Sequence, residues 1–270
     1  MPPTYTPLDS VALQRDLAAR APALTVKVIE ECGSTSTLLA ERVAADPATP
    51  GGSVIACERQ VAGRGRRGRV WMSEAGASLT FSLLWRFGGA ARRGPALSGL
   101  SLAVAVAVAQ SLEQMGLIGI ALKWPNDLLY EGAKLGGILV EVSGPGIAII
   151  GIGLNVQLPP GFAATLDRAV TDLAAMTGGR FVLPDRTTLL AGVLAGLAAA
   201  MERYDREGFA PFRAGWQVRH AHQGLHVSLL RDDQSVAAEG IATGVAEDGA
   251  LLLRTAAGLQ RIHSGEVSLR

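Results

Sequence analysis

The sequence predicts an α+β protein, in which a large domain of strands and helices is followed by a small β-barrel. Continuous apolar runs at 53–57, 78–85 and 147–156 have the length and composition of buried strands. Residues 97–115 are alanine-rich and apolar on every side, which predicts a helix in the core. From Gly224 the pattern changes to short alternating strands separated by turn residues, which predicts a barrel of about 50 residues.

These patterns divide the chain into a larger domain, residues 1–222, and a C-terminal domain, residues 223–270. Residues 1–23 read as a short N-terminal extension of the larger domain. Within it, residues 8–20 predict an amphipathic helix capped by Asp9 or by the serine after it. A helix-turn-helix unit needs at least two helices, so we expect no DNA-binding domain in this extension.

The composition favours a cytoplasmic protein. The chain has 270 residues, an apolar fraction of 49% and a formal net charge of +1. It contains neither a basic and apolar leader nor an apolar run long enough to span a bilayer, and its two cysteines make no disulfide framework. Only three of its 25 basic residues are lysines (Lys27, Lys123 and Lys134), so a lysine is an unusual choice in this chain.

A cluster of small polar residues, Gly33-Ser34-Thr35-Ser36-Thr37, lies between a predicted strand at 24–29 and a predicted helix at 38–43. Ser36 or Thr37 could serve only as the helix cap. Alternatively, the hydroxyls and amides of the cluster could bind a small neutral polar ligand, or an anion at the helix N-terminus. The residues leave these two interpretations open.

An arginine- and glycine-rich loop, residues 63–69, follows the strand at 53–57. Glycines permit sharp turns and close approach of the backbone, and guanidinium groups bind phosphates in a bidentate fork. The loop satisfies the G-x-G-x-x-G spacing, but no helical pattern follows it, which argues against a dinucleotide fold. A nucleic-acid arm is an alternative, although the low net charge gives it little support. We expect a loop that closes over a phosphorylated ligand.

Two further polar segments follow the core helix. In residues 122–128 a proline predicts a bend between two short strands, with Lys123, Asn126 and Asp127 beside it. Asp127 could hold Mg²⁺ together with phosphates. Lys134 enters an apolar run beside two glycines, where an anionic ligand or Glu141 could be its partner.

The strand at 147–156 carries glycines that permit close approach and ends near Asn155. Residues 165–216 predict two or three helical pieces around Pro184 and Pro211, which we interpret as packing elements. His220 and His222 lack neighbouring cysteine or glutamate, so no metal site is expected there.

Together these motifs resemble the biotin protein ligases, also called biotin–[acetyl-CoA-carboxylase] ligases. The resemblance covers about residues 25 to 270 and rests on these segments: Gly-Ser-Thr at 33–35, Gln60 with the loop to Arg69, Lys-Trp-Pro-Asn-Asp at 123–127, Lys-Leu-Gly-Gly-Ile-Leu at 134–139, Gly-Ile-Gly-Leu-Asn at 151–155, and the tail segments at 249–253 and 265–270. It implies a class II synthetase-like mixed sheet with helices and an SH3-like C-terminal domain. Bifunctional members carry an N-terminal winged helix that this chain lacks, so the chain resembles the monofunctional class. Ser36 departs from the asparagine usual in the family.

The resemblance implies a two-step reaction. Biotin is activated with ATP to biotinyl-5′-AMP, and biotin then passes to a lysine of the biotin carboxyl carrier domain of acetyl-CoA carboxylase or a similar carboxylase. The reacting centre would include Lys134 and Arg66, with Asp127 holding Mg²⁺. The implied biotin-binding residues are Ser34, Thr35, Ser36, Gln60, Arg64, Gly65, Arg66, Lys134 and Gly136. The implied ATP-binding residues are Arg66, Arg67, Trp71, Lys123, Asn126, Asp127 and Asn155.

By this interpretation the partner is a carrier protein, with neither nucleic acid nor membrane involved, and the enzyme is a monomer or a homodimer. Two alternatives remain. A lipoate-type protein ligase would share the fold and form an acyl-adenylate. A nucleic-acid-binding module would use the arginine loop and the barrel, and would bind with a salt-dependent affinity.

Overall fold

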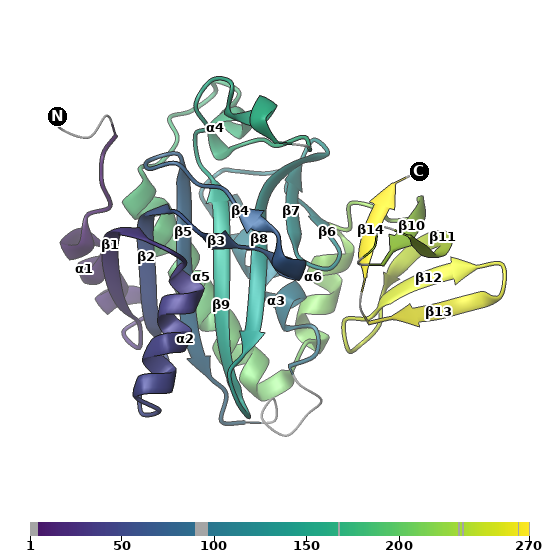
Figure 1. Cartoon of the computed structure of the whole chain (residues 1–270), viewed down its shortest axis with the longest axis horizontal. Helices are drawn as coiled ribbons and strands as arrows, with labels where there is room; N and C mark the ends of the chain where they lie inside the picture. The colour runs from purple at the N-terminus through teal and green to yellow at the C-terminus, as the bar shows by residue number, and fades with distance from the viewer. Residues whose placement is uncertain are drawn as a thin grey trace.

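The computed structural model describes residues 5–89, 97–166, 168–231, 233, 235–263 and 265–269. They form a large sheet covered by helices and a separate small sheet at the C-terminal end of the chain (Figure 1). Residues 1–4 and Arg270, which belong to the predicted N-terminal extension and C-terminal tail, lie outside the described residues. The α+β prediction is confirmed.

The large sheet has seven strands in the order β1-β2-β5-β9-β8-β7-β6. Their bounds are β1 Thr25–Cys32, β2 Ser53–Gln60, β5 Ser78–Arg86, β6 Ala121–Lys123, β7 Asp127–Tyr130, β8 Ala133–Val142 and β9 Ile147–Asn155. β1 and β2 are parallel and the other neighbours are antiparallel, so the sheet is mixed. Every apolar run that predicted a buried strand lies within this sheet.

Helices cover the two faces of the sheet unequally. α1 (Ser10–Arg20), α3 (Leu100–Gln114) and α5 (Arg186–Glu207) pack on one face and build the main core. α3 is buried along nearly its whole length, as its sequence predicted. α2 (Thr35–Ala45) covers part of the opposite face, beside a small hairpin of β3 (Gly63–Arg64) and β4 (Val70–Trp71) (Figure 1). That second face is therefore only partly covered by helix.

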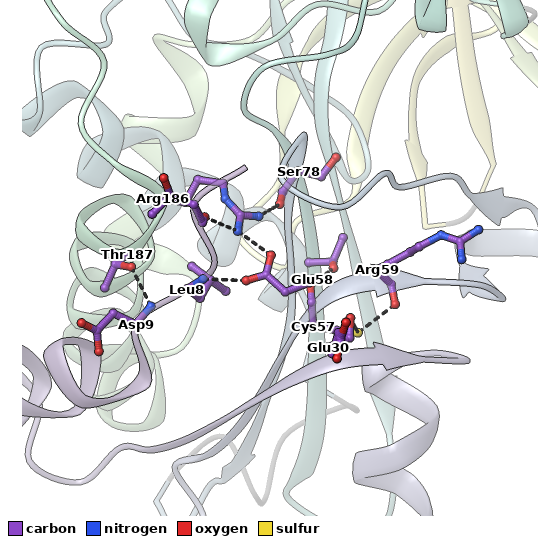
Figure 2. Close-up of polar contacts among 11 residues, drawn as sticks. Leu8, Asp9, Glu30, Cys57, Glu58, Arg59, Ser78, Arg186 and Thr187 are labelled. Atoms are coloured by element: carbon purple, nitrogen blue, oxygen red, sulfur yellow. Dashed lines mark hydrogen bonds and ion pairs between the residues drawn. The ribbon is translucent and has the colours of Figure 1, made fainter. Parts of the chain in front are cut away.

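A buried ion pair ties the start of the described chain to the sheet. Glu58 of β2 pairs with Arg186 at the start of α5, and its other carboxylate oxygen accepts the backbone N–H of Leu8 at 2.6 Å (Figure 2). Arg186 also donates to the carbonyl oxygens of Thr6 and Ser78, both at 3.2 Å. α1 follows this segment, and Asp9 caps it by accepting two backbone N–H groups. One helix therefore precedes β1 in the described chain, as predicted.

The region predicted as helical packing pieces contains less helix than expected. Short turns at η3 (Phe162–Thr165) and η4 (Ala210–Phe212) and the short helices α4 (Leu173–Thr177) and α6 (Arg213–Gln217) flank the long α5. The prediction is wrong for residues 168–172, because this segment pairs with the backbone of β8 instead: the backbone N–H of Lys134 donates to the carbonyl of Ala169, and that of Thr171 donates to the carbonyl of Lys134.

The C-terminal strands form one antiparallel sheet in the order β13-β12-β11-β10-β14. Their bounds are β10 His226–Leu230, β11 Val236–Val245, β12 Leu251–Thr255, β13 Gly258–Ile262 and β14 Glu266–Leu269. The Trp124 indole N–H donates to the Gly249 carbonyl at 3.1 Å, which fixes this sheet against the larger domain. No helix in the described ranges has the length and apolarity that crossing a bilayer requires.

Candidate active site

A pocket opens on the α2 face of the large sheet, where β8 and β9 meet the β3–β4 hairpin. Side chains from six sequence segments line it. They are Ser34, Thr35 and Ser36; Gln60; Arg64, Gly65, Arg66, Arg67, Arg69, Val70, Trp71 and Met72; Lys123 to Asp127; Lys134, Gly137, Ile138 and Leu139; and Gly151, Ile152, Gly153 and Asn155. Phe81, Phe162, Leu166, Arg168, Val170 and Gly265 complete the lining. The polar motifs singled out in the sequence thus converge on one cavity.

Glycines make the floor of this pocket. A Cβ atom on Gly151 would lie 2.6 Å from the Ser36 hydroxyl oxygen, and one on Gly137 would lie 3.3 Å from Lys134 Nζ. A Cβ on Gly153 would overlap the ring of Trp71. Because strands alternate their side chains between faces, an ordinary residue at these positions would project into the pocket and fill it. The expected close approach of the backbone is therefore present at Gly151 and Gly153.

At the α2 end the pocket is lined with hydroxyl groups. Ser34 caps α2 by accepting the backbone N–H of Thr37 at 3.5 Å, which corrects the expectation that Ser36 or Thr37 is the cap. Ser36 lies one residue inside the helix and is buried. Gln60 Oε1 accepts both the backbone N–H of Thr35 at 2.8 Å and its hydroxyl at 3.1 Å. The cluster is a fixed polar surface rather than only a helix start.

The arginine loop forms the hairpin β3–β4 with a single 3₁₀ turn, η1 (Arg66–Gly68), between its strands. Arg67 has φ 58° and Gly68 has φ 70°, a left-handed pair that reverses the chain. Arg64 pairs with Glu141 of β8 through both guanidinium nitrogens, with the shorter contact at 2.7 Å. Arg66 donates to Asn126 Oδ1 at 3.5 Å. The loop therefore leaves the end of β2, as predicted, and lies over the pocket.

Lys134 and Asp127 form an ion pair inside the pocket, with Nζ 2.6 Å from Oδ1. Burial lowers the pKa of Lys134, and the charge and hydrogen bond of Asp127 partly oppose this effect. The suggestion that Glu141 neutralises Lys134 is wrong, because Glu141 is engaged by Arg64. An ammonium group carries three protons, so two protons of Lys134 can still be donated to a ligand.

The bend between β6 and β7 carries the Lys-Trp-Pro-Asn segment, as predicted. The Asn126 side chain donates to the Ile138 carbonyl at 2.8 Å, which fixes its amide against β8. Its Oδ1 then faces Arg66, so the bend and the arginine loop meet across the pocket. Lys123 lines the same wall.

Two predicted residues have other surroundings than expected. Gly136 does not line the pocket, because its Cα faces Leu154 of β9, whose Cδ2 would lie 2.7 Å from an added Cβ; its neighbour Gly137 lines the pocket instead. Asn155 lines the pocket but donates its amide to the carbonyl of Thr171 at 2.9 Å, which joins the end of β9 to the segment beyond it.

Sequence reasoning missed two contributors to the pocket. Leu166, Arg168 and Val170 come from the segment that was expected to be helical, and Phe162 lies just before it. The prolines and glycine at 159–161 were a signal that this segment is not a continuous helix. Gly265 comes from the C-terminal domain, and no local pattern pointed to it.

The charge of the lining is strongly positive. Among the described lining residues the cations are Arg64, Arg66, Arg67, Arg69, Arg168, Lys123 and Lys134, and the only carboxylate is Asp127. Such a pocket is suited to a ligand that carries several negative charges, such as a nucleotide phosphate chain. The hydroxyl-lined end is suited to an uncharged polar group.

Comparisons with known proteins agree with this geometry. Residues 28–156 match the Biotin/lipoate A/B protein ligase family, and residues 222–270 match the Biotin protein ligase C terminal domain. The chain is 34% identical to the Bifunctional ligase/repressor BirA of Escherichia coli strain K12, over 91% of this chain and 74% of that protein. It is 35% identical to the Biotin--[acetyl-CoA-carboxylase] ligase of Paracoccus denitrificans, over 86% and 97% of the two chains. A biotin protein ligase from Aquifex aeolicus, solved in complex with biotin and ATP, superposes with a TM-score of 0.75 at 29% identity, covering 91% of this chain and 98% of that one.

Proposed function

The chain belongs to the Biotin/lipoate A/B protein ligase family, and we propose that it is an ATP-dependent biotin protein ligase. It activates biotin as biotinyl-5′-AMP and transfers it to a lysine of a biotin carboxyl carrier domain. The observation that carries this proposal is the single pocket in which a hydroxyl-lined end adjoins a row of cations. The antiparallel sheet at the C-terminal end lies in the part of the chain that matches the Biotin protein ligase C terminal domain.

Two bonds change in the first step. A biotin carboxylate oxygen forms a bond to the α-phosphorus of ATP, and the bond from that phosphorus to the pyrophosphate oxygen breaks. Charge builds on the phosphoryl oxygens, so positioning and charge neutralisation contribute most of the catalysis. Lys134, with two protons available, and Arg66 are the groups that we assign to the oxygens around the reacting phosphorus.

The biotin head is assigned to the hydroxyl end of the pocket. Ser34, Thr35, Ser36 and Gln60 offer both donors and acceptors there, which matches a cyclic urea. Arg64 and Gly65 line the same pocket. We assign them to the biotin carboxylate, with the valeryl chain running toward Lys134.

The nucleotide is assigned to the opposite end, near Arg67, Lys123 and Asn126. Trp71 supports this placement, because its indole nitrogen is buried and has no hydrogen-bond partner among the described residues. Such a donor is available to a ligand acceptor. The Asn155 amide already donates to the Thr171 carbonyl, so Asn155 contributes to the nucleotide end as part of the pocket wall.

A magnesium ion fits this site only in company with phosphates. Asp127 is the one carboxylate among the described lining residues, and the described chain contains no group of three or more acidic, histidine or cysteine side chains that could hold a metal ion. Mg²⁺ characteristically takes one or two carboxylates and completes its shell with phosphate oxygens and water. Asp127 would hold the ion, which would neutralise charge on the phosphate chain.

In the second step the amine of the carrier lysine forms a bond to the biotin carbonyl carbon, and the bond from that carbon to AMP oxygen breaks. The mixed anhydride must be kept from water until the carrier arrives. The arginine loop over the pocket mouth is the element that we assign to this protection. A carrier domain of acetyl-CoA carboxylase or a similar carboxylase is the proposed partner, and the cytoplasm is the proposed location.

Biotin-dependent exchange of labelled pyrophosphate into ATP tests the proposal, with lipoate and octanoate as control acids. Exchange with biotin alone supports it. Exchange with lipoate alone would make the chain a lipoate-type ligase. Folded protein that exchanges with no acid in the presence of Mg²⁺ would contradict a ligase function, and salt-dependent binding to DNA or RNA would then be measured. Transfer of labelled biotin to a purified carrier domain tests the second step.

A further inference from the structure

Ser82 is a fully buried residue that does not line the pocket but holds together the two hydroxyls that do. It lies in the middle of β5, opposite Gly151 of β9, with a relative exposure of 0%. Its Oγ lies 2.7 Å from the Thr35 hydroxyl and 2.9 Å from the Ser36 hydroxyl. Both of those residues line the pocket.

One hydrogen bond in this cluster, the one from the Thr35 backbone N–H, has a fixed direction, and it determines the directions of the others. The backbone N–H of Thr35 can only donate, so the Gln60 side-chain atom that it meets at 2.8 Å must be the carbonyl oxygen. That oxygen only accepts, so the Thr35 hydroxyl at 3.1 Å must give its single proton to it. Thr35 is therefore an acceptor toward Ser82.

The remaining protons follow in turn. Because Thr35 accepts, Ser82 must donate its single proton to Thr35. Ser82 is then an acceptor toward Ser36, and Ser36 must donate to Ser82. The protons run in one direction, from Ser36 to Ser82 to Thr35 to Gln60. Both pocket hydroxyls have their protons committed inward.

We propose that Ser82 is a positioning residue for ligand specificity: it accepts the Ser36 proton, so that the Ser36 oxygen is an acceptor on the pocket side beside the Thr35 oxygen, whose proton is held by Gln60. This inference rests on the proposed function. A cyclic urea presents two N–H donors and one carbonyl acceptor. Ser34 caps α2 as an acceptor, so its own proton is available for a ligand carbonyl. One donor and two acceptors in the pocket thus match the urea, whereas a dithiolane ring offers no N–H groups to the two acceptors.

Gly151 makes this arrangement possible. A Cβ at this position would lie 2.6 Å from the Ser36 oxygen and 3.5 Å from the Ser82 oxygen. The space that the glycine leaves on the floor allows the small Ser36 side chain to reach Ser82.

The test compares biotin with a biotin analogue in which one ureido N–H is replaced by oxygen, a cyclic carbamate of nearly the same shape. The KM for each acid is measured by pyrophosphate exchange in wild type, Ser82→Ala and Ser111→Ala. Ser111 is the matched control, because its hydroxyl is also buried, donates to the Ala107 carbonyl at 2.8 Å and does not line the pocket. The KM for ATP is measured in parallel.

In wild type the carbamate oxygen meets an acceptor, and its KM should exceed that of biotin by about 100-fold. Ser82→Ala frees the Ser36 hydroxyl to rotate, while Gln60 still holds the Thr35 proton. The KM for biotin should therefore rise about tenfold and the preference over the carbamate should fall to about tenfold. Ser111→Ala should retain the wild-type preference, and the KM for ATP should be unchanged in all three proteins.

A Ser82→Ala variant that retains the wild-type preference for biotin over the carbamate would overturn the proposal. This holds even if the KM values for both acids rise, because a merely structural role raises them in proportion. If that variant does not fold, Ser82→Cys decides the question, since its weaker donor should give an intermediate preference and an unchanged preference would overturn the proposal. Failure of wild type to exchange with biotin would instead contradict the proposed function itself.

Discussion

Lys134 of β8 and Asp127 of β7 face each other across neighbouring strands, with Nζ 2.6 Å from Oδ1. Both side chains are more than three-quarters buried, with relative exposures of 16% and 20%. The carboxylate holds the ammonium in a defined direction, while two of its protons remain for ligand oxygens. The pair therefore joins the residue that we assign to the reacting phosphorus and the residue that we assign to Mg²⁺.

Replacing Lys134 should stop adenylate formation without unfolding the protein. Lys134→Ala removes the charge nearest the proposed reacting oxygens, and we expect pyrophosphate exchange to fall about 100-fold or more. Circular dichroism should show wild-type secondary structure. Lys27→Ala is the matched control, because Lys27 lies on the edge strand β1 away from the pocket. Exchange near the wild-type rate in Lys134→Ala would remove this residue from the site.

The arginine loop should retain the adenylate. In Arg66→Ala we expect biotinyl-5′-AMP to dissociate about tenfold faster or more, because a charge-assisted hydrogen bond to the phosphate is lost. Release of radiolabelled adenylate is followed by rapid filtration. Arg59→Ala serves as the control, since Arg59 pairs with Glu31 on the surface and does not line the pocket. Equal release rates in the two variants would mean that Arg66 does not clamp the intermediate.

The buried pair of Glu58 and Arg186 should matter for stability rather than for chemistry. Glu58→Gln leaves the Arg186 charge without its counter-ion in the interior, and we expect the free energy of unfolding to fall by about 3 to 5 kcal/mol. Urea unfolding measures it. The double variant Glu58→Leu with Arg186→Met should be less destabilised than Glu58→Gln, because no charge remains buried. If the free energy of unfolding of Glu58→Gln falls by less than about 1 kcal/mol, the pair stabilises the protein no more than an exposed salt bridge does.

Histidine burial should make the protein less stable in acid. Burial lowers the pKa of His222 to about 4 from its ordinary 6.5, and the nearby charges of Lys123 and His220 act in the same direction. The unfolded chain then binds more protons than the folded one between these two values. The stability present above pH 6.5 should be lost progressively as the pH falls toward 4, by up to about 3 kcal/mol.

Urea unfolding at pH 7.5, 5.5 and 4.5 measures this slope in wild type and in His222→Gln, whose side chain does not titrate. The variant should lose most of the slope. The part that remains should include His220, whose pKa is also lowered by burial, with its hydrogen bond to Gln223 opposing the shift. An unchanged slope in His222→Gln would show that this histidine is accessible to protons in the folded state.

Local motifs predicted most of the pocket because each motif is a turn or a strand end with its own chemistry. The glycine and arginine content of residues 63–69, the proline bend after Lys123 and the glycines of β9 can each be read without knowing the fold. Contacts between distant strands could not be read in this way. The sequence offers an anionic ligand or Glu141 as the partner of Lys134, whereas the turn at Glu131 and Gly132 folds β7 back against β8 and brings Asp127 beside it.

Ser82 and the segment at 168–172 show the same limit. Ser82 lies in an apolar strand, and its importance comes from the register that places it opposite Gly151. Residues 165–216 were expected to be helical, but residues 168–172 instead pair their backbone with that of Lys134. In both cases tertiary pairing decides the role of the residue, and one sequence does not record that pairing.

The glycine floor at Gly137, Gly151 and Gly153 changes how this protein should respond to mutation. At most positions an alanine scan measures what is lost when a side chain is shortened. Here alanine adds a methyl group, and at Gly153 that group would overlap the ring of Trp71. Inactive alanine variants at these positions would show where the substrates need empty space. The shape of the pocket can therefore be mapped by adding side-chain atoms as well as by removing them.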